Sequence, residues 1–273
     1  MNLTDIRRIF NRALILTFST KKLLMISSLL ALCGLLVVFS RGLAVHANYW
    51  ITLSLTFTPI LLCTGVLLSA GIFLTRVYHD EIKGKEVNYS EILANSWEAI
   101  IAASYFSIPI VLIYLLLWMI LGIFILLQEI PGVGNFFMAI LAFAPFLLNL
   151  SSLLLCIFAL LVLYFVTPIV ALKGGNRIQL ANRLTDRIKG DAFFNLLLGT
   201  LAILPLVFSV GILAFAAFLT ESMCGAICNS SVYTVIHSFF MMIPFAIMLS
   251  PAVIFFFNLA AEAHVLMRKM QET

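Results

Sequence analysis

Few side chains of this chain could bind a metal or transfer a proton, and they lie far apart. His79, Asp80 and Glu81 are consecutive and could supply metal ligands, but a metal site would need further ligands from other segments. His237 lies a few residues into an apolar run, where it could act as a base only if a nucleophile faced it. We therefore predict no metal site, no catalytic residue and no bound cofactor.

Glu262 and His264 form a second candidate pair, near the end of the last apolar run. Side chains two residues apart on a helix point to different faces. We interpret both as solvated residues of a helix end. The sequence also lacks the zinc motif His-Glu-x-x-His, the phosphate-binding loop and the Gly-x-Ser-x-Gly nucleophile motif. These patterns do not predict an enzyme.

Cysteines divide into two groups by their surroundings. Cys33, Cys63 and Cys156 lie in apolar runs, whereas Cys224 and Cys228 lie in the loop between the last two runs. Residues four apart in a turn can come within bridging distance, so the loop pair forms either a disulfide, on an oxidising side, or two free thiols. Thiol labelling with and without reductant distinguishes the two hypotheses.

The composition places the elements in a membrane. The chain has 273 residues, of which 63% are hydrophobic and 10% charged, and its mean hydropathy is +1.14. A helix needs roughly 20 apolar residues to cross a bilayer. Six apolar runs meet or approach this length: residues 23–39, 50–74, 99–127, 136–172, 193–219 and 232–261. The predicted fold is an all-α, polytopic transmembrane helical bundle of about six spans.

Two of these runs allow a second interpretation. Residues 136–172 exceed one span and contain Pro145 and Pro168. They are either a re-entrant or interfacial helix up to Pro145 followed by one span, or a single tilted helix, because tilt absorbs surplus length. The first run could instead be a signal peptide with a small-residue site at 44–47, although Arg41 is unusual there.

The distribution of basic residues predicts the orientation. Of the sixteen Lys and Arg residues, fifteen lie before the first run, in the loops after the second and fourth runs, or in the tail, and Arg41 lies on the other side. Positive charge is retained in the cytoplasm, so both termini are predicted to be cytoplasmic. This gives a cytoplasmic N-terminal helix at 1–22, a six-span domain at 23–264 and a cytoplasmic tail at 265–273.

Three basic or polar segments before the odd-numbered spans can form amphipathic helices that would lie along the headgroup layer. In the first, Ile9 and Ala13 belong to the apolar face; the second begins with a capping box made by Asn88 and Glu91. The first and third segments carry the residues predicted to contact lipid or a partner. They are Arg7, Arg8, Arg12, Arg177, Arg183, Arg187 and Lys189. The spacing of the segments suggests that one hairpin unit is used three times.

Residues 165–175, Phe-Val-Thr-Pro-Ile-Val-Ala-Leu-Lys-Gly-Gly, are followed by Leu-Ala-Asn-Arg at 180–183 and Lys-Gly-Asp at 189–191. This pattern resembles the membrane domain fused to some glycerophosphodiester phosphodiesterases, a group that includes the YciC-like proteins. The resemblance covers mainly residues 160–215. It implies a six-span fold in the bacterial inner membrane, and it brings no catalytic residues.

Two function classes follow from these observations. The first is a non-enzymatic membrane partner or scaffold at the cytoplasmic face, which binds anionic lipid headgroups or other membrane or cytoplasmic proteins, and no nucleic acid. The alternative is a transport module, such as a permease-type subunit for a small or lipid-like solute. Permease subunits usually carry a Glu-Ala-Ala loop, and here Leu184-Thr185-Asp186 stands in its place. The oligomeric state is left open.

Overall fold

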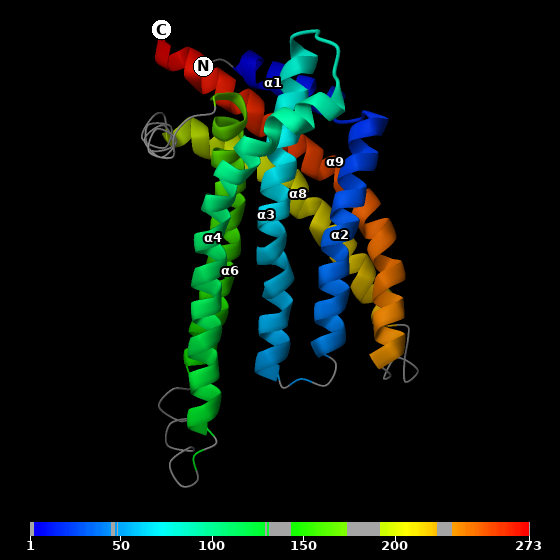
Figure 1. Cartoon of the computed structure of the whole chain (residues 1–273), viewed down its shortest axis with the longest axis vertical. Helices are drawn as coiled ribbons and strands as arrows, with labels where there is room; N and C mark the ends of the chain where they lie inside the picture. Colours follow the sequence, from blue (N-terminus) through cyan, green and yellow to red (C-terminus); the bar gives the residue numbers. More distant parts are fainter. Residues whose placement is uncertain are drawn as a thin grey trace.

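The computed structural model describes residues 3–44, 47, 49–128, 130, 143–173, 192–222 and 231–272. These residues form seven α-helices and no strand (Figure 1). The helices are α1 Leu3–Ile15, α2 Thr20–Ala44, α3 Tyr49–Ile82, α4 Tyr89–Gln128, α6 Ala144–Lys173, α8 Ala192–Ser222 and α9 Ser231–Glu272.

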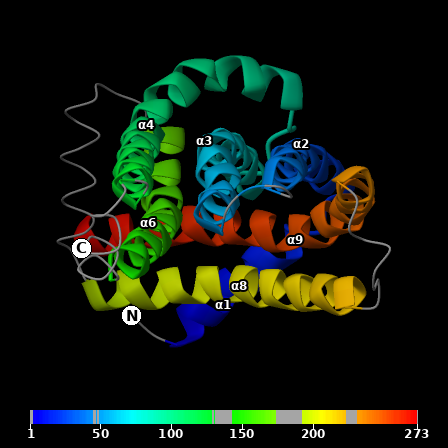
Figure 2. The same cartoon turned by 90° about the horizontal axis from the view of Figure 1, so that it is seen from below.

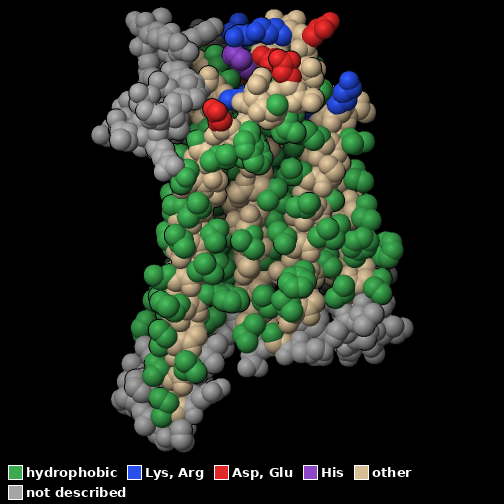
Figure 3. Space-filling model, in the orientation of Figure 1, with side chains coloured by type: hydrophobic (Ala, Val, Ile, Leu, Met, Phe, Trp, Pro, Cys, Tyr) green, Lys and Arg blue, Asp and Glu red, His purple; other side chains and the backbone are tan. Residues whose placement is uncertain are grey.

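Six of these helices are long and apolar enough to cross a membrane, which confirms the predicted six-span helical bundle. The candidate spans are Thr20–Ala44, Ser54–Ile82, Tyr89–Phe124, Phe146–Leu172, Asn195–Thr220 and Val235–Leu266. Figure 3 shows hydrophobic side chains over the whole length of the bundle and most of the visible charged ones at one end. We call that end, made by residues 3–22, 76–98 and 258–272, the charged end.

The spans are arranged as three antiparallel hairpins, α2 with α3, α4 with α6, and α8 with α9 (Figure 1). Helix α9 is the centre of the packing, because it contacts α1, α2, α3, α6 and α8. The first and last spans, α2 and α9, therefore lie side by side. Helix α1 and the last turns of α9 lie at the same end, the charged end. The internal repeat stays a prediction.

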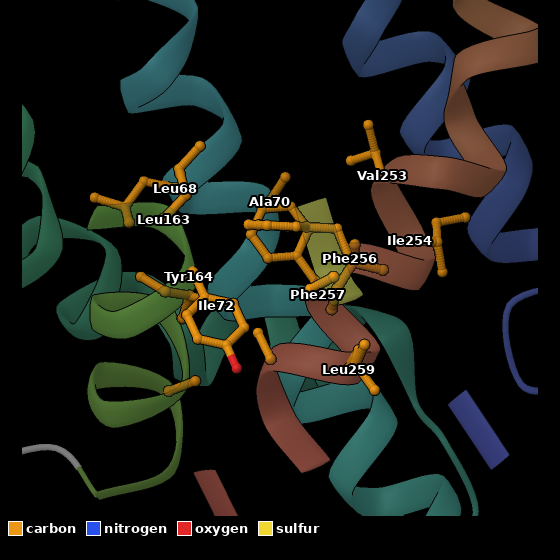
Figure 4. Packing of buried hydrophobic residues seen from close by; sticks show 14 of the residues in the cluster. Leu68, Ala70, Ile72, Leu163, Tyr164, Val253, Ile254, Phe256, Phe257 and Leu259 are labelled. Atoms are coloured by element: carbon orange, nitrogen blue, oxygen red, sulfur yellow. The ribbon is translucent and has the colours of Figure 1, made fainter. Parts of the chain in front are cut away.

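The largest buried cluster contains residues of all seven helices, most of them from α3, α6 and α9, and surrounds the second half of α9 (Figure 4). Prolines inside α9, at Pro244 and Pro251, each remove a backbone hydrogen bond and can bend the helix. In Figure 2 the beginning of α9 is seen almost end-on and its second half runs across the bundle. An unbroken run of buried residues, 252–263, results from this crossing.

The fourth span begins at Ala144, with Pro145 in its first turn. Proline suits a helix start because the first N–H groups have no partner within the helix. Residues 144–173 are thus one span that starts where the first interpretation placed its boundary. The re-entrant or interfacial helix predicted from residue 136 up to Pro145 falls mostly outside the described residues, because 136–142 are not among them.

The second interfacial segment differs from its prediction in one respect. Helix α4 begins at Tyr89, directly after Asn88, as the capping box predicted. It then continues without a break into the span, because no Gly or Pro occurs between residues 89 and 108. Figure 2 shows its first turns as an arc across the end of the bundle before the helix turns along the others. The segment is the bent beginning of a span, and not a separate helix.

Candidate functional site

Helix α1 packs on the second half of α9 at the charged end. Ile9 and Ala13 are buried, and the ring of Phe10 meets that of Phe255 edge to face, with centroids 5.1 Å apart. Part of the apolar face that we expected along the headgroup layer is therefore covered by protein. The sequence could not show this, because an amphipathic helix fits a protein surface and a membrane surface equally well.

Asn258 of α9 ties α1 and the turn after it to the bundle. Its amide nitrogen donates to the carbonyl oxygen of Ala13 and to Oγ1 of Thr17, both at 3.3 Å. Thr17 in turn donates to Ala13 O at 2.7 Å. Asn258 and Thr17 are 0% and 1% exposed, respectively. A buried amide that bonds a neighbouring backbone specifies one position of α1, because loss of its partners would leave it unsatisfied.

Glu262 is the next polar group along α9, and its predicted role as a solvated residue is wrong. It is 7% exposed, and its Oε1 accepts hydrogen bonds from Tyr78 Oη at 2.9 Å and Arg12 Nη1 at 3.2 Å. Helix α9 crosses the bundle here, so its end passes under α1 and beside α3. Burial of a carboxylate is tolerated because two donors, one of them charged, compensate its desolvation. The cluster joins α1, α3 and α9.

Lys22, in the first turns of α2, is fully buried, with no exposed surface. Its Nζ donates to the carbonyl oxygen of Leu16 at 2.7 Å and to Oε2 of Glu81 at 2.5 Å. The turn at residues 16–19 brings the start of α2 against the end of α3. Glu81 is partly open, with its side chain 17% exposed. The pair fixes the connection between α1 and α2 on α3.

A glycine ends α3 three residues after Glu81. Gly84 has φ +66°, and the backbone bonds Gly84 N to Glu81 O and Lys85 N to Asp80 O form a Schellman motif. Glycine suits this position because left-handed backbone carries a steric cost for residues with a Cβ.

Arg76 of α3 bonds the ends of two further helices, α4 and α6, at the charged end. Its Nε donates to Ala171 O in the last turn of α6 at 3.0 Å, and its Nη1 donates to Asn95 O at 2.6 Å and Ser96 Oγ at 3.1 Å. Asn95 and Ser96 lie in the bent beginning of α4. A side chain that bonds helix carbonyls in this way can hold a bend. Arg76 thus connects α3, α4 and α6 with neutral acceptors.

The outer surface of the α1 segment carries both charge and apolar side chains. Arg7 and Arg8 are exposed, and Leu14, Ile15 and Phe18 are 41%, 74% and 65% exposed. All of these groups except Phe18, which lies in the turn after α1, are on a helix whose other face is fixed to α9.

The remaining predicted positions divide between those that the structure places and those that it does not. Arg12 is bound to Glu262, with its side chain 45% exposed. Arg177, Arg183, Arg187 and Lys189, and the cysteine pair Cys224 and Cys228, lie outside the described residues. Within the described ranges, no group of three or more His, Cys, Asp or Glu side chains is placed to hold a metal ion. Glu81, one of the three consecutive residues considered above as possible metal ligands, accepts a hydrogen bond from Lys22.

The polar residues of this site that the sequence did not reveal are Lys22 and Tyr78, which are buried, and Arg76, which is half-buried. Each lies within two turns of the end of an apolar run, where side chains are normally solvated. A usable signal was the presence of complementary groups at similar distances from the ends of different runs, as in Lys22 and Glu81. The distance of a residue from the end of its own run does not show which helices are neighbours.

No protein-family model, curated protein or solved structure matches this chain. Its class follows from the structure alone. Six helices of sufficient length and apolar composition make it an integral multi-pass membrane protein.

Proposed function

We propose that the protein is a non-enzymatic membrane scaffold that acts at its charged end, which faces the cytoplasm and binds anionic lipid headgroups. The observation that carries this proposal is the fixed position of α1. Contacts with α9 through Ala13, Thr17 and Glu262 hold the helix across the bundle. A surface helix held in this way presents the same side chains to a membrane or a partner at all times.

The chemistry of the exposed surface supports a lipid ligand. Arg7 and Arg8 are free to face phosphate groups, and Ile15 and Phe18 expose apolar surface on the same segment. Basic residues beside apolar ones are the combination that lies in a headgroup layer. Each basic residue near an anionic surface gains about 1 kcal/mol of attraction. The first candidate ligand is therefore an anionic phospholipid.

Substitution of both Arg7 and Arg8 by glutamine is expected to remove most of the stabilisation that anionic lipid provides. A ligand that binds only the folded state raises the unfolding temperature. The wild type should unfold at a higher temperature in nanodiscs that contain phosphatidylglycerol than in nanodiscs of phosphatidylcholine alone, and the double variant should lose this difference. Thermal unfolding in the two lipid mixtures measures it.

Arg41→Gln is the control for position, because Arg41 lies at the opposite end of the bundle and its loss also removes positive charge, one unit against the two of the double variant. This variant should keep the response to phosphatidylglycerol. High salt should weaken the response of the wild type, since surface attraction is screened. An unchanged lipid response in Arg7→Gln/Arg8→Gln would refute the role of α1.

The proposed orientation has its own expected result. Reporters that are active only outside the cytoplasm should work when they are fused after His46, Gly134 or Ser230. Reporters that need the cytoplasm should work after Lys85 or Asn182. Activity on the wrong side at any of these five positions would overturn the six-span topology with cytoplasmic termini. Fusions at both sets of sites serve as controls for each other.

A further inference from the structure

The guanidinium of Arg76 is only partly used by the protein. Arginine has five N–H donors. Three are taken by Ala171 O, Asn95 O and Ser96 Oγ, through Nε and Nη1. The two N–H groups of Nη2 bond no acceptor in the described part of the chain. Arg76 is half-buried, but its Nη2 is not one of the fully buried polar atoms that lack a partner. An atom without a partner that is not fully buried has some exposed surface, so this nitrogen is reachable from outside.

Among the described residues, no carboxylate contacts Arg76 and neutralises its charge. All three acceptors are uncharged, and the ion pairs among the described residues are Arg12 with Glu262 and Lys22 with Glu81. The carboxylate whose charge acts on Arg76 is that of Asp80, one turn further along α3, and the two side chains form no ion pair. A half-buried cation without an anion in contact is costly unless an external anion approaches.

The position of Arg76 determines which anion can do so. Its partners lie in the last turn of α6 and in the bend of α4, where α4 turns from the end of the bundle into its span (Figure 2). Trp97, next to Ser96, is 64% exposed. Exposed tryptophan is typical of the boundary between lipid chains and headgroups. The accessible nitrogen therefore lies at the depth of lipid phosphates.

We propose that Arg76 binds a phosphate oxyanion through Nη2, at a site between α3, α4 and α6. The phosphate comes from a phospholipid headgroup or from free phosphate in solution, and the chemistry of the site is the same for both. Phosphate oxygens suit a guanidinium because its planar N–H groups match their spacing. This proposal depends on the proposed function in one respect, which is that the charged end lies in the headgroup layer. It does not involve α1.

Substitution of Arg76 by lysine keeps the positive charge and reduces the number of N–H donors, so it tests the two effects separately. An ammonium group has three donors, and the three protein acceptors would take all of them. Arg76→Lys should therefore keep the charge and the bend of α4 but leave no free donor for a phosphate. Arg76→Gln removes the charge as well. Lys85→Gln is the control, because Lys85 is exposed at the same end and its side chain is not part of the site.

Native mass spectrometry of the whole protein in mild detergent tests the site, with phosphatidylglycerol and inorganic phosphate titrated separately. The wild type and Lys85→Gln should bind one equivalent of at least one ligand, at least tenfold more tightly than Arg76→Lys and Arg76→Gln. Saturation by phosphatidylglycerol alone identifies a headgroup as the source, and saturation by phosphate identifies the solution. Equal binding of both ligands by the wild type and Arg76→Lys would overturn the proposal.

The experiment separates this site from the role of α1. Arg7→Gln/Arg8→Gln should keep the single tightly bound phosphate, whatever its response to bulk anionic lipid. Loss of the bulk response with retention of the bound phosphate supports both proposals. Retention of the bound phosphate together with an unchanged bulk response in the double variant refutes only the scaffold proposal.

Discussion

Lys22→Met is expected to lower the free energy of unfolding by about 3 kcal/mol, because removal of one partner from a buried ion pair leaves the other charge uncompensated. The methionine fills a similar volume, so the change tests charge more than packing. It leaves Glu81 and the Leu16 carbonyl without their donor. Glu81 keeps some access to solvent through its 17% exposed side chain, which places the effect near the low end of the range. Chemical unfolding in detergent micelles measures it.

The reciprocal change should cost more. Glu81→Gln removes the negative charge and leaves the fully buried ammonium of Lys22 with neutral acceptors, and we expect a loss of about 4 kcal/mol. The double variant Lys22→Met/Glu81→Gln should lose less than the sum of the two single changes, since neither charge is then left alone. Additive losses would show that the two side chains do not interact.

Lys21→Met is the matched control for this pair. Lys21 is the neighbouring residue and is exposed, and its interaction with the ring of Tyr89, 5.9 Å from the centroid, is weak at the surface. We expect a change below about 1 kcal/mol. A loss at Lys21 as large as that at Lys22 would mean that the start of α2 responds to any loss of charge.

The contrast between Lys21 and Lys22 shows how far the sequence could predict this fold. Six spans were predictable, because the bilayer requires a length and a composition that each run displays on its own. Adjacent lysines before an apolar run are indistinguishable in the same terms. Their fates differ because Lys22 meets Glu81, which is 59 positions away in the chain. A pattern within one run contains no information about which other run lies beside it.

Helix α1 illustrates the same limit from the other side. Its apolar positions were identified correctly, since Ile9 and Ala13 are buried. What covers them was not predictable, because the covering surface is the second half of α9, about 245 residues later. Glu262 was misinterpreted for the same reason. It lies at the end of a run, where solvent is the usual neighbour, but the oblique path of α9 carries it under α1.

Gly71→Ala is expected to have the second large effect, a loss of about 3 kcal/mol from overpacking. A Cβ on Gly71 would overlap the ring of Phe257 and lie 2.7 Å from Cγ2 of Thr167. Both neighbours are buried, at 1% and 0% exposure, and an aromatic ring in a packed core has little freedom to move. Helix α3 would therefore have to shift away from α6 and α9 together. Thermal unfolding in detergent measures the loss.

Two other glycines serve as controls for the contact of Gly71 with Phe257 and Thr167. At Gly34 the added Cβ would overlap Met242, whose flexible thioether can adopt another rotamer, so Gly34→Ala should cost about 1 kcal/mol or less. At Gly211, on the outer helix α8, the described part of the chain has no atom within 4 Å of the added Cβ, and alanine should be neutral or slightly stabilising because it favours helix. The expected order of destabilisation is Gly71, then Gly34, then Gly211. Equal effects at Gly71 and Gly211 would mean that α3 and α9 do not meet at Phe257, and the core that supports the charged end would then need a different packing.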